Sequence, residues 1–294
     1  MITVLLSTYN GERYLREQIE SILRQEGVEV HLFVRDDGST DSTLSILDEY
    51  SQRGLLTYYT SPNLGAAKSF LQLLADAPES DFYAFADQDD YWQSDKLYEA
   101  VSRLSATEPS LYFSRTTLTD KELNPTGCVE IDPYLTFGES LVYEFVAGCT
   151  IVMSKPLRDV IVTYRPDYLP MHDVWVYSIA LGLGAKVVFD KQSHILYRQH
   201  GNNTTGQGQG VIHDCKQRMR RILRKENSRY RRACELQKGF AHLFKAENAQ
   251  LLTDFIKAKH SLPRRLALGC RRQLACANST TAFLFRVALL ANTY

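Results

Sequence analysis

An acidic cluster at residues 87–90, with the sequence DQDD, is the first candidate for chemistry. Three carboxylates in four positions repel one another, so a bound cation would stabilise their ionised form. Mg²⁺ and Mn²⁺ are hard ions that prefer such oxygen ligands. The alternative is that Asp90 or Asp95 caps the following helix while the other carboxylates are solvated. The cluster therefore predicts a divalent-metal site and leaves helix capping open.

A second acidic cluster occupies residues 36–41, with the sequence DDGSTD. A carboxylate in this position can accept hydrogen bonds from a nucleotide base or from ribose hydroxyls. The cluster also holds good helix N-caps, because Ser39 and Asp41 precede a helical pattern. Both roles remain open for it.

The elements around these clusters alternate between strand and helix patterns. Strands are expected at 2–7, 30–34, 55–60 and 82–86, and helices at 12–25, 41–50, 66–75 and 96–104. This alternation predicts a Rossmann-like α/β domain, with a mostly parallel sheet and helices on both faces. Ligands of such sheets bind outside the carboxyl ends of the strands. The polar turns at 8–11, 36–40, 63–65 and 87–90 should therefore converge on one edge.

The second half of the chain follows a mixed pattern. Strands are expected at 111–118, 149–153, 186–189 and 194–197, and an apolar helix at 172–183. Residues 201–210 are rich in Gly, Asn, Thr and Gln, which is typical of a linker. Beyond them, residues 211–259 and 264–294 favour helices. We therefore predict a catalytic α/β domain over 1–205 and a basic helical region over 206–294.

Composition places the chain among globular proteins. It has 294 residues, of which 44% are hydrophobic and 23% charged, which excludes a mainly disordered or collagen-like chain. The six cysteines form no CxxC pair, and we interpret them as reduced thiols of a cytoplasmic protein. No apolar run approaches the about 18 residues of a membrane span.

The formal net charge of zero conceals a strong asymmetry. Residues 1–210 contain 16 basic and 29 acidic residues, and residues 211–294 contain 18 and 5, so the two parts carry −13 and +13. Arginine alternates with leucine and phenylalanine near the C-terminus, which favours peripheral contact with an anionic membrane surface. The alternative is a helical extension that packs on the acidic part. Nucleic acid is not expected as a partner, because no nucleic-acid motif accompanies the charge.

Several short motifs, taken in order, resemble one enzyme family. They are residues 7–11 (STYNG), 36–41 (DDGSTD), 63–65 (NLG), 86–92 (ADQDDYW), 172–173 (HD) and 197–200 (YRQH). Together they resemble the family-2 inverting glycosyltransferases of the GT-A fold, and among these the bacterial rhamnosyltransferase-like enzymes. The resemblance covers roughly residues 1–205.

The resemblance implies roles for particular residues. The nucleotide of the donor would contact Ser7, Tyr9, Asp37, Lys68 and Asp87. Mg²⁺ or Mn²⁺ would be bound by the last carboxylate of the DxD element and by a C-terminal histidine, which here are Asp89 and His200.

The resemblance also implies the residues around the reacting sugar. Asp173 would be the catalytic base, and the donor sugar or the acceptor would contact Gly148, Trp92, His172 and Trp175. Family members often have Glu-Asp where this chain has His172-Asp173, so the role of the histidine is open.

Each of these roles has a structural alternative. Asp173 could cap its helix, and His200 could be an ordinary loop residue. The two tryptophans could belong to the core, and Gly148 could serve only a tight turn.

The predicted function is therefore metal-dependent inverting transfer of a sugar such as L-rhamnose. The donor would be a dTDP- or UDP-sugar, and the acceptor a saccharide or lipid-linked saccharide of a cell-surface polysaccharide. Competing classes are a nucleotidyltransferase, an oxidoreductase and a non-catalytic nucleotide-sugar-binding protein. The glycine-rich phosphate loop that the first needs is missing, and residues 9–14 (YNGERY) lack the GxGxxG pattern of the second.

Overall fold

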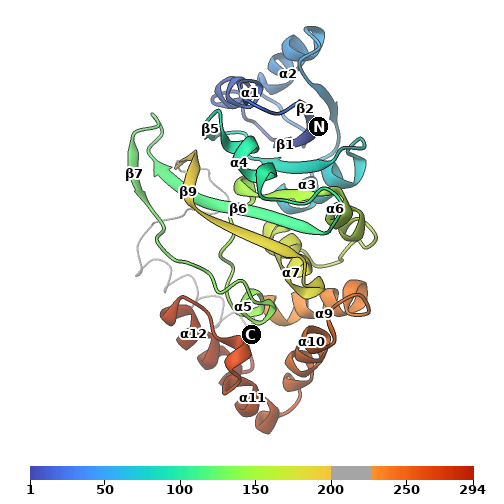
Figure 1. Ribbon diagram of the computed structural model, residues 1–294, viewed down its shortest axis with the longest axis vertical. Helices are drawn as coiled ribbons and strands as arrows, with labels where there is room; N and C mark the ends of the chain where they lie inside the picture. The colour runs from blue at the N-terminus through green and yellow to red at the C-terminus, as the bar shows by residue number, and fades with distance from the viewer. Residues whose placement is uncertain (200–226) are drawn as a thin grey trace.

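The computed structural model describes residues 1–199 and 227–294 (Figure 1). His200 and the densely basic stretch 216–225 lie outside these residues, so the metal role expected for His200 stays a prediction. The described residues form one nine-stranded sheet. Its order is β3 (Thr57–Thr60), β2 (Val30–Asp36), β1 (Ile2–Thr8), β4 (Phe82–Ala86), β8 (Val152–Ser154), β6 (Ser110–Thr119), β9 (Lys186–Arg198) and β5 (Tyr91–Trp92), and β7 (Pro125–Cys128) pairs with β6.

Four neighbouring strands, β3, β2, β1 and β4, are parallel, as the alternating pattern predicts. Successive residues of each strand point to opposite faces. Thus Val4 and Leu6 of β1 belong to one buried cluster while Leu5 belongs to the other. Strand β8 is antiparallel to β4 and β6, so the complete sheet is mixed.

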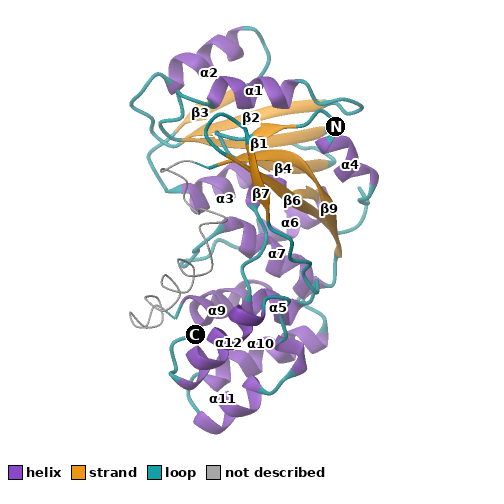
Figure 2. Cartoon of the chain, turned by 90° about the vertical axis from the view of Figure 1, so that its left-hand side faces the viewer, coloured by secondary structure: helices purple, strands orange, loops and turns teal. Residues whose placement is uncertain are grey.

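Helices cover both faces of the sheet (Figure 2). One face carries α1 (Leu15–Leu23), α2 (Thr43–Gln52) and α4 (Lys96–Ser102), and the other carries α3 (Ala66–Asp76), α6 (Lys155–Ile161) and α7 (His172–Leu183). The apolar helix predicted at 172–183 is α7, with the same bounds. Nearly every α7 residue is buried, because the helix lies between the sheet and the C-terminal helices.

The C-terminal helices are α9 (Ser228–Phe240), α10 (Ala246–Ala258), α11 (Leu262–Gly269) and α12 (Ser279–Leu290). They pack around α5 (Phe137–Val142) and share one core with the sheet face that carries α7. The ring of Phe240 lies 5.7 Å from that of Trp175, and Arg232 forms a 2.8 Å ion pair with Glu144. Residues 227–294 of the basic region thus pack on the acidic part, which is one of the two alternatives left open.

Two local predictions were wrong. The strand expected at 149–153 starts as a 3₁₀ turn, η1 (Gly148–Thr150), because the backbone N–H groups of Thr150 and Ile151 bond back to the carbonyls of Ala147 and Gly148. The two short strands expected at 186–197 are one strand, β9, whose pairing with β6 shifts register near Ser114. Polar residues interrupt its hydrophobic pattern, and its pairing with β6 resumes at Ser193 after the register shift.

Among the described residues, no helix combines the length and apolar character that crossing a bilayer requires. None of the five described cysteines forms a disulfide.

Candidate active site

A cleft of about 800 Å³ opens at the carboxyl ends of β1, β2 and β4. All four polar turns that the sequence analysis singled out contribute to it. Segments before and at the start of α7 close the other side. The lining includes Ser7, Tyr9, Asp37, Asn63, Asp87, Asp89, Gly148, His172, Asp173 and Tyr197.

The turn after β2 is held by Asp36. Its carboxylate accepts hydrogen bonds from the hydroxyl of Thr8 at 3.1 Å and from the backbone N–H groups of Gly38 and Ser39 at 3.0 and 2.9 Å. Gly38 has a φ of +84°, a conformation that glycine adopts without steric cost. Asp36 therefore has a structural role at the base of the cleft.

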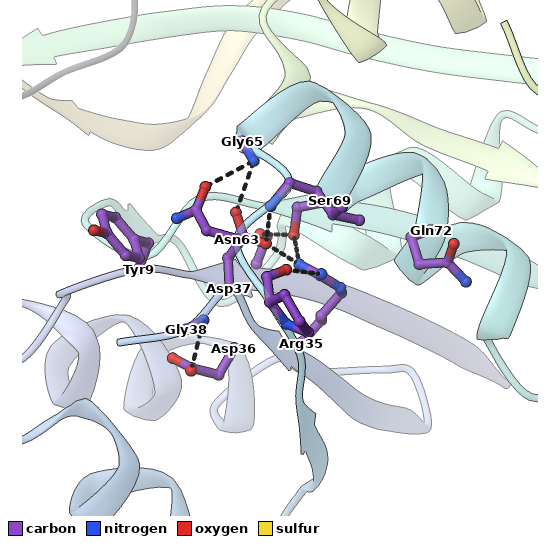
Figure 3. A network of polar contacts seen from close by, with 12 residues as sticks. Tyr9, Arg35, Asp36, Asp37, Gly38, Asn63, Gly65, Ser69 and Gln72 are labelled. Atoms are coloured by element: carbon purple, nitrogen blue, oxygen red, sulfur yellow. Dashed lines mark hydrogen bonds and ion pairs between the residues drawn. The ribbon is translucent and has the colours of Figure 1, made fainter. Parts of the chain in front are cut away.

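Asp37 is the centre of a buried network at the cleft wall (Figure 3). Its carboxylate pairs with the buried guanidinium of Arg35. The same carboxylate accepts hydrogen bonds from the backbone N–H groups of Leu64 and Gly65 at 2.8 and 3.0 Å. Arg35 also donates to Ser69 Oγ at 2.7 Å. Asp37 thus ties β2 to the 63–65 turn and still lines the cleft where a nucleotide contact was predicted.

Gln88 joins the turn after β1 to the acidic loop after β4. Its side-chain oxygen accepts from the N–H of Tyr9 at 2.9 Å, and its amide donates to the carbonyl of Tyr9 at 3.2 Å. A Cβ atom at Gly11 would lie 2.4 Å from that oxygen, so a larger residue there would displace the Gln88 side chain from these bonds. Gln88 consequently holds the turn after β1 next to the acidic loop after β4.

Two carboxyl groups of the acidic loop, those of Asp87 and Asp90, have raised pKa values. Burial, followed by the charges of Asp89 and Asp173, raises the pKa of Asp87 to about 7. Burial also raises the pKa of Asp90 well above its usual range, and one Asp90 oxygen lacks a hydrogen-bond partner among the described residues. Ligand atoms of Asp87, Asp90 and Cys149 lie within 4.8 Å of one another. The two carboxylates of this set suit Mg²⁺ or Mn²⁺, whereas the Cys149 thiol is a soft ligand that these ions do not favour.

Asp173 lies in the first turn of α7 and faces the same cleft. One of its oxygens accepts from the N–H of Val174 at 2.6 Å. Burial raises the pKa of Asp173 to about 7, which is suited to a group that gains and loses a proton near neutrality.

His172 packs between two phenylalanines beside Asp173. Its ring stacks on Phe70 at 4.1 Å and meets the edge of Phe85 at 4.9 Å. Burial lowers the pKa of His172 to about 3, so the ring is neutral. A Cβ atom at Gly148 would lie 2.7 Å from His172 Nε2. Gly148 is therefore required for close packing against the histidine, not for a tight turn alone.

Both tryptophans predicted to contact sugar are core residues, so that prediction was wrong. Trp92 is 1% exposed, and the ammonium of Lys96 lies 3.5 Å from the centre of its ring. Trp175 is fully buried against Tyr164 and Phe240. Neither lines the cleft, because each points from its element into the core.

Lys68 is also not brought to the cleft. Its side chain is exposed on α3, whereas the neighbouring Phe70 lines the cleft and Ser69 bonds to Ser7 Oγ at 2.6 Å. The predicted nucleotide contact of Lys68 therefore finds no support in the arrangement.

Sequence reasoning gave no role to Arg198, which holds the backbone of the acidic loop in place from outside the cleft. Its Nε donates to the carbonyl of Asp89 at 2.8 Å, and its backbone N–H donates to Asp90 Oδ1 at 3.2 Å. The guanidinium also pairs with Glu17 and lies 4.4 Å from the centre of the Tyr14 ring. Arg198 belongs to the 197–200 motif, which gave it no role of its own, and its contacts with the acidic loop depend on long-range packing.

This chain is similar to known proteins in sequence and in structure. The family description Glycosyl transferase family 2 matches residues 3–139. The dTDP-rhamnosyl transferase RfbG of Shigella flexneri is 32% identical over 216 residues, which cover 68% of this chain and 73% of RfbG. TarS 1–349 of S. aureus, solved in complex with UDP-GlcNAc, matches with a TM-score of 0.61 at 18% identity, over 93% of this chain and 78% of that one.

The mannosyltransferase PcManGT from Pyrobaculum calidifontis, solved with GDP-Man and Mn²⁺, matches with a TM-score of 0.52 at 16% identity, over 99% of this chain and 85% of that one. The sheet, its covering helices and these likenesses define a glycosyltransferase fold of the GT-A type. The chain belongs to glycosyl transferase family 2, as the family match and the relation to RfbG show. The fold and the enzyme class predicted from the sequence are thereby confirmed.

Proposed function

We propose that the protein is a metal-dependent inverting glycosyltransferase that uses a nucleoside-diphosphate sugar. The observation that carries this proposal is the pairing, across one cleft, of the carboxylates Asp87 and Asp89 after β4 with the buried carboxyl of Asp173. The former suit a metal-bound diphosphate, and the latter suits an acceptor hydroxyl. RfbG is named as a dTDP-rhamnosyl transferase, which supports dTDP-L-rhamnose as the first donor to test, with UDP-sugars next.

The reaction would be a single displacement. The acceptor oxygen forms a bond to the anomeric carbon from one face while the bond to the diphosphate oxygen breaks on the other. Asp173 takes the proton of the attacking hydroxyl, and the nucleoside diphosphate leaves with the bonding electron pair. A pKa near neutrality lets Asp173 accept this proton at physiological pH.

Mg²⁺ or Mn²⁺, when bound, would offset the negative charge that develops on the leaving diphosphate. Asp89 and Asp87 would hold the ion, with His200 as a further predicted ligand. The PcManGT structure contains Mn²⁺ together with GDP-Man, which supports a divalent ion here. Arg198 holds the backbone of this loop in place from outside the cleft.

The nucleotide would lie along the turns after β1 and β2. Ser7, Tyr9 and Asp37 line this part of the cleft. The ring of Tyr9 is 49% exposed, and it is available to stack on a base. Asp37 already accepts three hydrogen bonds within the protein, so any contact with the nucleotide uses its remaining acceptor capacity.

The acceptor would be a saccharide or lipid-linked saccharide in the synthesis of a cell-surface polysaccharide. Such an acceptor places the enzyme in the cytoplasm, at the inner face of the cell membrane. The excess of basic residues in the C-terminal region supports this location.

A thermal-shift screen tests the proposal. The wild type and Asp89→Ala are melted with UDP, dTDP, GDP or CDP, each with Mn²⁺ or with a chelator. A ligand that binds only the folded state raises the melting temperature. We expect one diphosphate to stabilise the wild type only with Mn²⁺, and Asp89→Ala to lose this effect. Stabilisation of both proteins without metal would overturn the metal site.

A turnover assay with the nucleotide so identified completes the test. The matching sugar nucleotide should be consumed slowly in water and faster with an acceptor. If no sugar nucleotide binds the wild type in any condition, the proposed function fails.

A further inference from the structure

Two neighbouring helices at the end of the molecule expose large apolar side chains. On α11, Leu262 and Leu266 are each 51% exposed, and on α12, Phe283 and Leu290 are 63% and 55% exposed. The spacings of four and seven residues place each pair on one face of its helix. Ten large hydrophobic residues are exposed across the described chain, and these four are among them. We call Leu262, Leu266, Phe283 and Leu290 the apolar ridge.

Both helices also contribute buried residues, one from α11 and four from α12. Leu268 of α11 and Phe285 and Leu289 of α12 belong to the core, and Leu289 lies next to Gly269 at the end of α11. The two helices are thus anchored, and their exposed faces point away from the protein. Both lie at the end opposite to α2 and β2 (Figures 1 and 2). The apolar ridge is therefore a fixed outer surface.

Arginines accompany the apolar ridge. Arg264 of α11, Arg272 of η2 (Arg272–Leu274) and Arg286 of α12 are exposed, and none forms an ion pair with a described carboxylate. Arg286 lies on the same face as Phe283 and Leu290, three and four residues away. Residues 227–294 contain 12 basic and 3 acidic residues, so few negative charges compensate this end.

The occupant must therefore be both apolar and anionic. A second copy of the chain would place the same arginines against one another, because a two-fold contact repeats one patch on both subunits. The acyl region of a bilayer accepts exposed leucine and phenylalanine, while arginine reaches the anionic headgroups. A bilayer satisfies both requirements at once.

We propose that the apolar ridge, with Arg264, Arg272 and Arg286, is the surface by which this protein docks on an anionic membrane. The docking is peripheral, and α11 and α12 lie along the interface. It rests on the proposed function only in assigning a purpose, which is to bring the cleft to a lipid-linked acceptor.

Flotation with lipid vesicles tests this surface directly. The full-length protein is mixed with vesicles of phosphatidylcholine alone or with added phosphatidylglycerol, at low and at high salt. We expect the wild type to float only with the anionic vesicles at low salt. The double variants Leu266→Ser/Phe283→Ser and Arg264→Glu/Arg286→Glu should each lower the partition coefficient about tenfold or more. Tyr98→Ser and Arg24→Glu, at exposed positions near the sheet, are matched controls that should float like the wild type.

The outcomes separate this inference from the proposed function. A wild type that stays in the soluble fraction, or ridge variants that float like the controls, would overturn the docking surface. A wild type that is dimeric in size-exclusion chromatography while the ridge variants are monomeric would assign the ridge to self-association and also overturn it. Hydrolysis of the donor in solution should be the same in all folded variants. Its absence from the wild type would count against the proposed function and leave the flotation result standing.

Discussion

Two acidic turns, one after β2 and one after β4, look alike in the sequence and differ in their electrostatics. After β2, the carboxylates of Asp36 and Asp37 accept hydrogen bonds from backbone N–H groups, and Asp37 also pairs with Arg35. After β4, burial raises the pKa values of Asp87 and Asp90, and Asp90 has an oxygen without a partner among the described residues. Carboxylates that have hydrogen bonds and ion pairs within the protein stabilise the fold, whereas buried carboxylates with fewer such partners are available to bind a cation.

The largest expected effect is on turnover, and it should come from Asp173, which faces the loop after β4. Replacing Asp173 with Asn removes the proposed base and should lower turnover about 10²- to 10⁴-fold. Binding of the nucleoside diphosphate, measured by calorimetry, should not change. Asp159→Asn, a change at a partly exposed carboxylate on α6, is the control. Full turnover in Asp173→Asn would move the base elsewhere.

A change in the turn after β2 should instead lower the free energy of unfolding. Arg35→Met leaves Asp37 buried without its cation, and loss of one partner of a buried pair costs about 3–5 kcal/mol. Urea denaturation measures this change. Arg16→Met, which breaks an exposed pair with Glu49, should have little effect. If Arg35→Met and Arg16→Met lowered the free energy of unfolding equally, the buried pair would not be the stabilising feature of the turn after β2.

A smaller effect should separate metal binding from folding in the loop after β4. Arg198→Lys keeps the positive charge and the backbone contact with Asp90, but it cannot reproduce the guanidinium contacts with the Asp89 carbonyl and with Glu17. Since Arg198 positions the loop, the Mn²⁺ concentration that gives half-maximal activity should rise about tenfold. Activity at saturating Mn²⁺ should largely recover. A loss that no Mn²⁺ concentration repairs would show that the arginine serves folding alone. Arg115→Lys, which affects a partly exposed pair on the same sheet, is the control.

A further expected effect is a dependence of stability on pH. Burial raises the folded-state pKa values of Asp87 and Asp173 from 3.8 to about 7. In this interval the folded protein holds protons that the unfolded chain has released, so its stability should fall as pH rises from about 4 to about 7. Melting temperatures in a chelator should show this decline, and Asp173→Asn should reduce it.

Added Mn²⁺ sharpens the same test. Metal ligands bind in their deprotonated form, so Mn²⁺ should stabilise the protein more at about pH 8 than at about pH 5. A melting temperature independent of pH in the chelator would mean that the loop after β4 is as well compensated as the turn after β2.

The ends of the parallel strands and the polar turns that follow them could be predicted from the sequence. Alternating hydrophobic patterns are local, so they located β1, β2, β4 and α7 closely. Because parallel strands end at one edge, the meeting of the four turns at the cleft also followed from the sequence. The family motifs then supplied the class of enzyme.

Tertiary structure alone decided what each polar or aromatic residue does. Trp92 and Trp175 are fixed in the core by neighbours distant in sequence, and Arg198 reaches the acidic loop across 109 positions of the chain. The difference between Asp37 and Asp87 arises from burial and from partners that only folding assembles. Hydrophobic periodicity is a property of neighbouring residues, whereas desolvation and charge compensation depend on every group packed nearby, and these decide which carboxylates are available for chemistry.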